Sequence, residues 1–150
     1  MWRKFLSTPH DVSAFVIRIT LGGVLWAHGA QKFMGWFGGH GWIGTMQFFT
    51  SGLHIPVPLG VLAILTEFFG MAALALGLFG RAFAAGAATI MAVAIATVHH
   101  RFGFYMNWTT EPSRGEGFEL HLLAIAMAVA IMIRGSGAWS IDRLLARDRT

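Results

Sequence analysis

The sequence predicts an all-α fold: an integral membrane four-helix bundle with both chain ends in the cytoplasm. Hydrophobic residues make up 55% of the 150 residues and charged residues only 12%, whereas an average soluble chain carries roughly 25% charged residues. Four apolar stretches each approach the ~20 residues that a helix needs to cross a bilayer. The third stretch lacks the polar outer face that a helix of a soluble bundle needs. We therefore expect one transmembrane domain over residues 1–150.

Capping and helix-breaking residues place the ends of the four helices. Asp11 stands where an N-cap would precede the first apolar stretch. Pro56 and Pro58 suit the start of the second helix, and Gly80 suits its end. Gly135 is suited to close the fourth helix. The helices are expected at about residues 12–33, 58–79, 81–100 and 118–134.

The connections between these helices differ in length and character. The connection between the second and third helices is very short, which predicts that they are antiparallel neighbours. The two outer loops are expected at residues 34–57 and 101–117, and a short interfacial helix is expected around residues 42–51. The remaining residues, 135–150, form a cytoplasmic tail. Its apolar side chains would face the lipid as part of an amphipathic turn; they are Ile141, Leu144 and Leu145.

The distribution of basic residues predicts the orientation in the membrane. One side of the predicted bundle holds Arg3, Lys4, Arg81, Arg134, Arg143, Arg147 and Arg149, and the other holds Lys32, Arg101 and Arg114. The positive-inside rule places the side with more basic residues in the cytoplasm. We therefore expect a multi-pass protein of the bacterial inner (plasma) membrane whose two outer loops face the periplasm.

Composition and missing motifs exclude several functional classes. The chain has no cysteine, which excludes disulfides and thiolate metal sites. Its net charge of +4 comes mainly from the chain ends. The sequence has no patch of basic residues interleaved with aromatic residues, which is typical of a nucleic-acid-binding protein. No phosphate loop, nucleophile elbow or H-E-x-x-H motif occurs. We expect no nucleic-acid partner and no metal site, and the lipid bilayer as the first partner.

Two charged residues lie inside apolar helices, Arg18 in the first and Glu67 in the second. A charge in such a position marks a functional site with a partner elsewhere. Glu67 could reach Arg18 or His28, and the sequence does not choose between them. For Arg18 the alternative is a side chain that extends to the inner headgroups. For Glu67 the alternatives are a structural salt bridge and a proton-handling or ligand-anchoring carboxylate.

A second group of polar residues gathers near the outer ends of the predicted helices. Helix ends on one side of the membrane must lie in one layer, which brings together His28, Gln31, Lys32, His99, His100, Glu119 and His121. Glu119 at a helix N-terminus is favoured by the helix dipole. The alternative is an ordinary polar belt at the membrane interface.

A quinone head group would fit this outer layer. Histidine and lysine donate hydrogen bonds to carbonyl oxygens, and aromatic and methionine side chains can line an apolar slot; the candidates for that lining are Met34, Trp36, Phe37, Met106 and Trp108. Haem is the other cofactor considered, held by His28 with His99 or His121, although no C-x-x-C-H attachment motif occurs. The cofactor stays open at this point.

Several motifs in the chain are similar to those of the DoxX family. They are R-x-x-x-G-G at residues 18–23, H-G-x-Q-K-F-x-G at 28–35, Glu67 with Gly70, the start of the fourth helix at 118–123, and G-x-G-x-x-S-I-D at 135–142. The resemblance implies a four-helix bacterial inner-membrane protein. It also implies kinship with the DoxD-type subunit of archaeal thiosulfate:quinone oxidoreductase and with small membrane subunits of oxidoreductase complexes.

Together these features predict a redox-associated membrane subunit that binds a quinone-like or other lipophilic ligand near the periplasmic side. The expected catalytic residues are Glu67 and His28, and the expected ligand-binding residues are Arg18, Gln31, Lys32, His99, Glu119 and His121. Whether the chain is itself an enzyme stays open. The alternatives are a non-enzymatic scaffold of an oxidoreductase complex, a small carrier or channel, and a haem-binding protein. Further partners would be other subunits or copies of the same chain.

Overall fold

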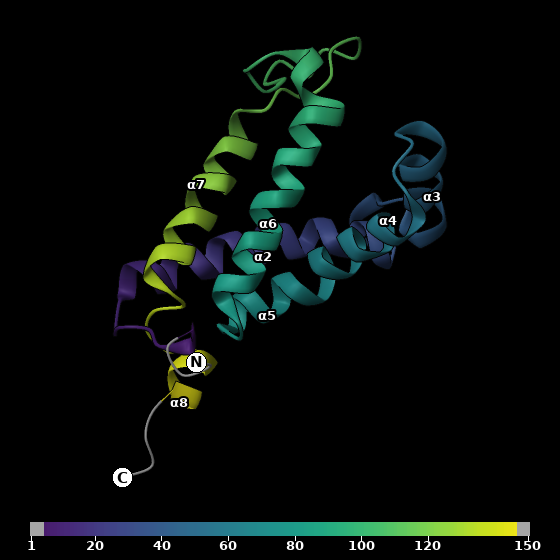
Figure 1. Cartoon of the computed structure of the whole chain (residues 1–150). Helices are drawn as coiled ribbons and strands as arrows, with labels where there is room; N and C mark the ends of the chain where they lie inside the picture. Colours follow the sequence, from purple (N-terminus) through teal and green to yellow (C-terminus); the bar gives the residue numbers. More distant parts are fainter. Residues whose placement is uncertain (1–4, 147–150) are drawn as a thin grey trace.

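Figure 1 shows a computed structural model of the chain, which describes residues 5–146. The described part contains helices, turns and loops and no strand, which confirms the predicted all-α class. The terminal basic residues used above to orient the chain lie outside the described residues; these are Arg3, Lys4, Arg147 and Arg149.

The first half of the chain forms a helical hairpin. Its first arm is α2 (Val12–Phe33). Its second arm, antiparallel to α2, is one continuous helix made of α4 (Val57–Leu65), the π-helical turn η3 (Thr66–Gly70) and α5 (Met71–Leu76). The connection between the arms holds the 3₁₀ turn η1 (Trp36–Gly38), α3 (Gly41–Gln47) and the π-helical turn η2 (Phe48–Gly52). The short interfacial helix expected around residues 42–51 thus corresponds to α3 and η2.

The second half of the chain forms another antiparallel hairpin. Its first arm is α6 (Gly80–Ala94), extended by the π-helical turn η4 (Ile95–His99) and the 3₁₀ turn η5 (His100–Phe102). Its second arm is α7 (Glu119–Arg134). The short helix α8 (Ile141–Ala146) follows after a turn.

In the described part of the chain, three helices are long and apolar enough to cross a membrane: Val12–Phe33, Val57–Leu76 and Gly80–Phe102. The helix α7 has 16 residues, a length of about 24 Å, which is less than the ~30 Å hydrocarbon core of a bilayer. The structure therefore supports a multi-pass membrane protein.

Local interactions explain where the helices begin and end. The Asp11 carboxylate caps α2 by accepting hydrogen bonds from the backbone N–H groups of Ser13 and Ala14, as the sequence predicts. The second helix ends earlier than expected. Gly77, not Gly80, adopts the left-handed conformation with φ +72°, and the Leu78 N–H closes the turn on the Ala73 carbonyl. This is the Schellman arrangement that favours glycine at a helix C-terminus.

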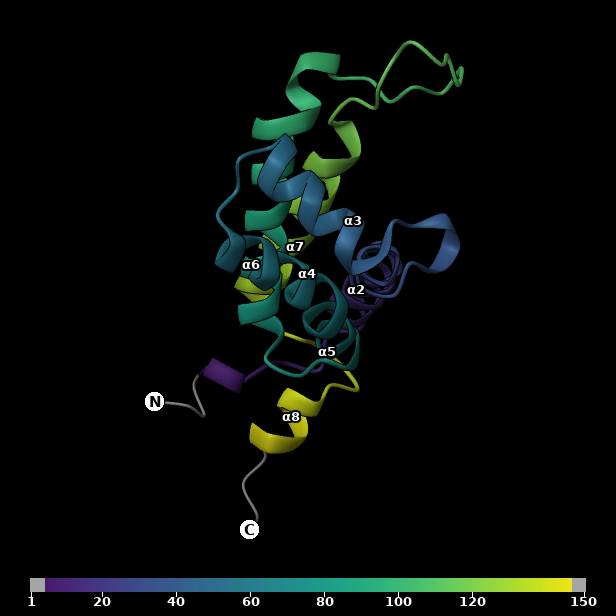
Figure 2. The same cartoon turned by 90° about the vertical axis from the view of Figure 1, so that its right-hand side faces the viewer.

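The two hairpins cross rather than lie side by side over their whole length. In Figure 2, α2 is seen nearly along its axis while α6 and α7 run up the picture. Figure 1 shows the hairpins meeting near the α5–α6 turn and diverging toward the ends that carry α3 and the 103–117 loop. The arrangement differs in this respect from the expected four-helix bundle. We refer to the end with the α5–α6 turn as the inner end, and to the two diverging ends that carry α3 and the 103–117 loop together as the outer end.

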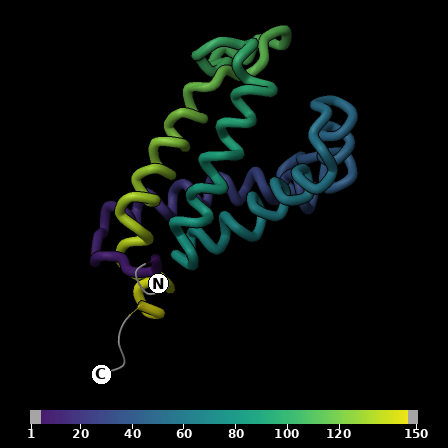
Figure 3. Tube along the Cα trace, in the orientation of Figure 1, coloured from purple at the N-terminus to yellow at the C-terminus, as the bar shows by residue number. Residues whose placement is uncertain are grey.

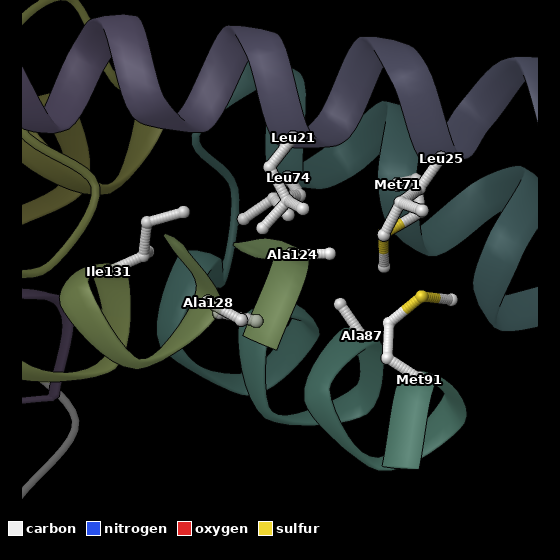
Figure 4. Packing of buried hydrophobic residues seen from close by; sticks show 10 residues of the cluster. Leu21, Leu25, Met71, Leu74, Ala87, Met91, Ala124, Ala128 and Ile131 are labelled. Atoms are coloured by element: carbon white, nitrogen blue, oxygen red, sulfur yellow. The ribbon is translucent and has the colours of Figure 1, made fainter. Parts of the chain in front are cut away.

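Small residues allow the helices to approach closely. A Cβ atom at Gly22 would lie 2.8 Å from the Ala75 nitrogen, and one at Gly29 would collide with the Glu67 backbone. Glycine at both positions lets the α2 backbone pack directly on α5 and η3. Between the hairpins lies an apolar core (Figure 4) of Leu21, Leu25, Met71, Leu74, Ala84, Ala87, Met91, Ala124, Ala128 and Ile131.

The segment before α2 and the segment after α7 meet at the inner end. Figure 3 shows the segment before α2 and the segment after α7 near the α5–α6 turn. The Ala138 N–H donates to the Asp11 carbonyl at 2.9 Å, and the Asp142 N–H donates to the Gly77 carbonyl at 2.8 Å. The segment that follows α7 therefore joins α2 to the α5–α6 turn.

Candidate functional site

Arg18 lies at the inner end and is bound to the segment that follows α7. Its guanidinium donates to the Ser136 carbonyl at 2.7 Å and to the Trp139 carbonyl at 3.2 Å, and it lies over the Phe15 ring. Only 1% of Arg18 is exposed, so the side chain does not extend to the headgroups. It does not pair with Glu67; Arg18 was one of the two partners that the sequence left open for that carboxylate.

Asp142 provides the negative charge of this inner site. Its carboxylate accepts hydrogen bonds from the backbone N–H groups of Phe79 at 2.7 Å and Gly80 at 2.9 Å, and from the Ser136 hydroxyl at 2.5 Å. The sequence analysis placed Asp142 in a family motif but missed this role. Its place in G-x-G-x-x-S-I-D directly after an apolar helix is the signal that marks it.

Two further arginines tie the inner end together. Arg81 donates to the backbone carbonyls of Phe5, Ser7 and Met132. Arg134 forms an ion pair with Asp11, with Nη2 and Oδ2 2.6 Å apart. The Ala14 N–H, which donates to the Asp11 carboxylate, and next the Arg134 guanidinium hold the pKa of Asp11 below its usual value. The inner end is thus a polar network that joins the segment before α2, α6 and the end of α7.

The outer end holds an ion pair between the arms of the first hairpin. Lys32, in the last turn of α2, binds the Glu67 carboxylate through Oε2. The Lys32 side chain is 31% exposed, whereas that of Glu67 is 2% exposed. Glu67 therefore forms an ion pair, but its partner is Lys32 and not Arg18 or His28, the two partners considered from the sequence.

The second oxygen of the Glu67 carboxylate has no hydrogen-bond partner among the described residues, although it is buried. Glu67 lies in the π-helical turn η3, and such turns occur frequently at functional sites because they reorient side chains within a helix. The glycine at position 29 allows this turn to lie against α2. The outer end therefore presents a buried, ion-paired carboxylate with an unused acceptor.

Each residue of this ion pair is followed in the sequence by a phenylalanine, and the rings of these two phenylalanines contact further aromatic rings. The Phe33 and Phe68 rings stack with their centroids 4.7 Å apart, and Trp26 stacks on Phe68 at 5.9 Å. Phe69 contacts both phenylalanine rings edge-on and is 56% exposed. The sequence analysis did not propose these rings, although Phe33 and Phe68 directly follow Lys32 and Glu67. They form an aromatic platform between the two arms of the first hairpin.

The residues expected to line a slot are not buried. Met34, Trp36, Phe37 and Trp108 are exposed, and Met106 is half-buried. Trp36 contacts Trp26 edge-on and so extends the aromatic platform.

His28 and Gln31 lie on the same outer part of α2. The His28 Nδ1 and the Gln31 Oε1 are 3.1 Å apart, and Gln31 Nε2 donates to the Phe37 carbonyl at 3.3 Å. His28 is exposed. An exposed imidazole one helical turn before Lys32 is available to a ligand that approaches from outside the hairpin.

The second hairpin contributes a pair of histidines to the outer end. The rings of His99 and His121 contact each other with their centroids 4.0 Å apart, and His99 Nδ1 lies 2.8 Å from the Glu116 carbonyl oxygen. The Nδ1 atom of His121 is buried and unpartnered within the described part of the chain.

Glu119 binds the outer loop rather than the other members of this layer. Its Oε1 atom accepts hydrogen bonds from the Met106 backbone N–H at 3.2 Å and from the Trp108 indole at 2.8 Å. Asn107, which the sequence analysis missed, donates to the carbonyls of Glu111 and Arg114. The loop is thus internally hydrogen-bonded. Among residues 5–146, no group of three or more histidine, aspartate or glutamate side chains could hold a metal ion.

The predicted outer layer therefore divides into two parts. His28, Gln31, Lys32 and Glu67 gather around the end of α2, and His99 and His121 face each other on the second hairpin. His100 points to the Ile95 carbonyl and Glu119 to the outer loop. Arg18 belongs to the inner network and not to the outer layer.

Comparison with known proteins agrees with this architecture. The model of the DoxX family matches residues 13–100, more than half of the 150 residues. The matched range contains the motifs around Arg18, His28 and Glu67, whereas the segments at 118–123 and 135–142 lie beyond it. No curated protein and no solved structure gave a match. Arg18, Glu67 and the helices that carry them lie inside the matched range. Because this range covers more than half of the chain, the chain belongs to the DoxX family of proteins.

Proposed function

We propose that this protein is a redox-associated subunit of the bacterial inner membrane that binds a quinone-like lipophilic ligand at its outer polar layer. Lys32 and Glu67 form the polar centre of the site, and His28 completes it from the same helix. His99 and His121 belong to the site from the second hairpin, and Gln31 positions His28. Family membership supports the link to the membrane and to redox chemistry.

The observation that carries this proposal is the Lys32–Glu67 ion pair, in which the Glu67 carboxylate is buried and its second oxygen is unused. A buried acceptor without a partner is costly, and intramembrane ionisable residues are functional by default. A structural ion pair needs further hydrogen bonds on its remaining oxygen to offset its desolvation. The unused acceptor therefore favours a site that is completed by a ligand.

The aromatic platform supports a flat, apolar ligand. Ligand sites combine apolar and aromatic linings with a few polar groups, and here the Phe33–Phe68 stack directly follows the ion-paired residues in the chain. Phe69 is exposed on the same platform. A ring with polar oxygens could thus reach the ion pair from the lipid while its ring packs on aromatic side chains.

We propose that α7 is the fourth membrane helix and that the outer layer faces the periplasm. Long apolar side chains are exposed along α7: Leu120, Leu122, Leu123, Val129, Met132 and Ile133. Arg81, Arg134 and Arg143 lie at the inner end, where their side chains or neighbours join the inner network. By the positive-inside rule, this end and both termini lie in the cytoplasm.

The experiment that tests the proposal is to identify what co-purifies with the protein in mild detergent. Solvent extraction followed by mass spectrometry should detect a quinone near one molecule per chain. Lys32→Ala and Glu67→Gln should lose most of it while retaining the helical circular dichroism spectrum. Matched controls are Arg101→Ala and Glu111→Gln, which change the same charges on exposed side chains. Equal ligand content in all five proteins would refute the proposal.

A double substitution separates ligand binding from a purely structural role of the ion pair. Replacing a buried ion pair with apolar residues of similar volume is often neutral or stabilising by about 1–4 kcal/mol. We expect Lys32→Met combined with Glu67→Leu to keep or raise thermal stability and to lose the quinone. If this variant keeps its quinone, Lys32 and Glu67 do not form the site. If no ligand is found in any form, the scaffold alternative takes its place.

A further inference from the structure

The unused oxygen of Glu67 leads to a more specific inference, which rests on the proposed function. Glu67 is 1% exposed. Its Oε2 atom is engaged by Lys32, and its Oε1 atom is buried with no partner among the described residues. An ionised carboxylate can only accept hydrogen bonds. The group that completes this site must therefore bring a hydrogen-bond donor.

The two redox forms of a quinone differ in this respect. The oxidised form carries two carbonyl oxygens, which only accept hydrogen bonds. The reduced form, the hydroquinone, carries two hydroxyl groups, each of which donates one hydrogen bond and accepts others. A carbonyl brought to Oε1 would place two acceptors against each other, whereas a hydroxyl would satisfy the carboxylate by a charge-assisted hydrogen bond.

We propose that the Lys32–Glu67 site binds the hydroquinone in preference to the quinone. Glu67 Oε1 accepts the hydrogen bond of one ligand hydroxyl. Lys32 can donate to the oxygen of that same hydroxyl, because its ammonium group has three donors and only one is used by the ion pair. The ion pair can thus bind a hydroxyl both as a hydrogen-bond donor, to Glu67, and as an acceptor, from Lys32.

The exposure of the two side chains indicates the direction of approach. Lys32 is 31% exposed and Phe69 is 56% exposed, whereas Glu67 is covered. A hydroquinone arriving from the lipid therefore meets Lys32 and the aromatic platform first. It reaches Glu67 Oε1 once the flexible lysine side chain has shifted.

The test compares the two redox forms of one short-chain ligand. Ubiquinone-1 and ubiquinol-1 are equilibrated separately with the full-length protein in detergent, without oxygen, and the bound fraction is measured by dialysis and chromatography. One charge-assisted hydrogen bond gained by only one form predicts about 10-fold tighter binding of ubiquinol-1. Equal binding, or tighter binding of ubiquinone-1, overturns the inference and leaves the proposed function standing. Binding of neither form overturns both.

A ligand-side control tests the donor without altering the protein. The dimethyl ether of ubiquinol-1 keeps the ring and both oxygens but lacks the O–H donors. It should bind no more tightly than ubiquinone-1. If the ether binds as tightly as ubiquinol-1, ring shape and not the hydroxyl explains the preference, and the inference fails.

A protein-side control tests the acceptor. An amide at position 67 offers both a donor and an acceptor, so Glu67→Gln should reduce the preference to about 2-fold or less. Glu116→Gln changes a carboxylate of the outer loop that accepts the Asn107 N–H and should keep the full preference. If Glu67→Gln keeps the preference of the unchanged protein, Glu67 does not cause it.

Discussion

The inner and outer ends of this molecule hold their intramembrane charges in opposite ways. At the inner end, Arg18 donates to two backbone carbonyls and Asp142 accepts three hydrogen bonds. The Nε atom of Arg18 is the one buried side-chain nitrogen or oxygen there that lacks a partner within residues 5–146. At the outer end, Glu67 Oε1 and His121 Nδ1 are both buried and unpartnered.

This difference distinguishes a structural network from a candidate binding site. The polar groups of the inner network connect four separate parts of the chain: the segment before α2, α2 itself, the α5–α6 turn and the segment after α7. The outer layer leaves polar groups unused beside exposed aromatic rings. Substitutions at the inner end should therefore lower stability, and substitutions at the outer end should lower ligand binding.

The largest effect on stability is expected from Asp142→Ala. The substitution removes the acceptor of three hydrogen bonds, from the Phe79 N–H, the Gly80 N–H and the Ser136 hydroxyl. Each buried donor left without a partner costs about 1–3 kcal/mol. Thermal unfolding in mild detergent, followed by circular dichroism, measures the loss.

The ligand content of the Asp142→Ala protein that remains folded should be unchanged, which tests the separation of the two ends. Glu111→Gln, on an exposed loop carboxylate, serves as the control and should unfold like the unchanged protein. A stable Asp142→Ala variant would show that the inner network does not hold the hairpins together.

An intermediate effect is expected from Gly29→Ala, with Gly23→Ala as its matched control on the same helix. A Cβ atom at Gly29 would collide with the Glu67 backbone and lie 2.7 Å from the Phe68 nitrogen, whereas one at Gly23 meets nothing within 4 Å. Overpacking of this kind typically costs about 1–3 kcal/mol, while alanine at an open helical position gains about 0.5–1 kcal/mol.

Because Gly29 lies against the turn that carries Glu67, Gly29→Ala should also reduce ligand content. The same two measurements, thermal unfolding and extraction of bound ligand, check both expectations. If Gly29→Ala and Gly23→Ala behaved alike, close packing of α2 on η3 would not be needed for either stability or binding.

The smallest effect is expected from the pH dependence of the Asp11 cap. The pKa of Asp11 is lowered, first by the hydrogen bond from Ala14 and then by Arg134. Because the pKa of Asp11 is lower in the folded state than its ordinary value of 3.8, the ionised carboxylate stabilises the fold when the pH is above 3.8. This contribution is lost as the pH falls below that value and through the folded-state pKa.

Melting temperatures measured across this acid range should therefore differ between the unchanged protein and Asp11→Asn at neutral pH and converge in acid. Asp11→Ser retains a capping side chain without a charge and should show no such pH dependence. The part contributed by Arg134, which is 63% exposed, should weaken at high salt. A constant difference at all pH values would mean that the charge of Asp11 does not contribute.

Much of the fold follows from composition and local signals. Long apolar stretches, the Asp11 cap and the prolines at positions 56 and 58 place the helices close to where they lie, and the motifs at residues 18–35 predict the family. Such features depend only on neighbours along the chain. The earlier end of the second helix shows the limit of this reasoning. A Cβ atom at Gly77 would collide with Arg18 and lie 2.5 Å from the Ser140 Cβ, and both neighbours are distant in sequence.

The sequence by itself determined that this chain is helical, that it belongs in a membrane and that Arg18, Lys32 and Glu67 are its unusual residues. Only the tertiary structure decided how those charges are partnered. Arg18 and Lys32 are 14 positions apart on α2, or about 21 Å, so different parts of the chain partner them. The antiparallel second arm brings Glu67 to Lys32, and the segment after α7 brings two backbone carbonyls to Arg18. Helical periodicity places residues on a face, but the partner across that face depends on the depth at which two helices cross. Here that depth is set by Gly22 and Gly29, where the backbones meet.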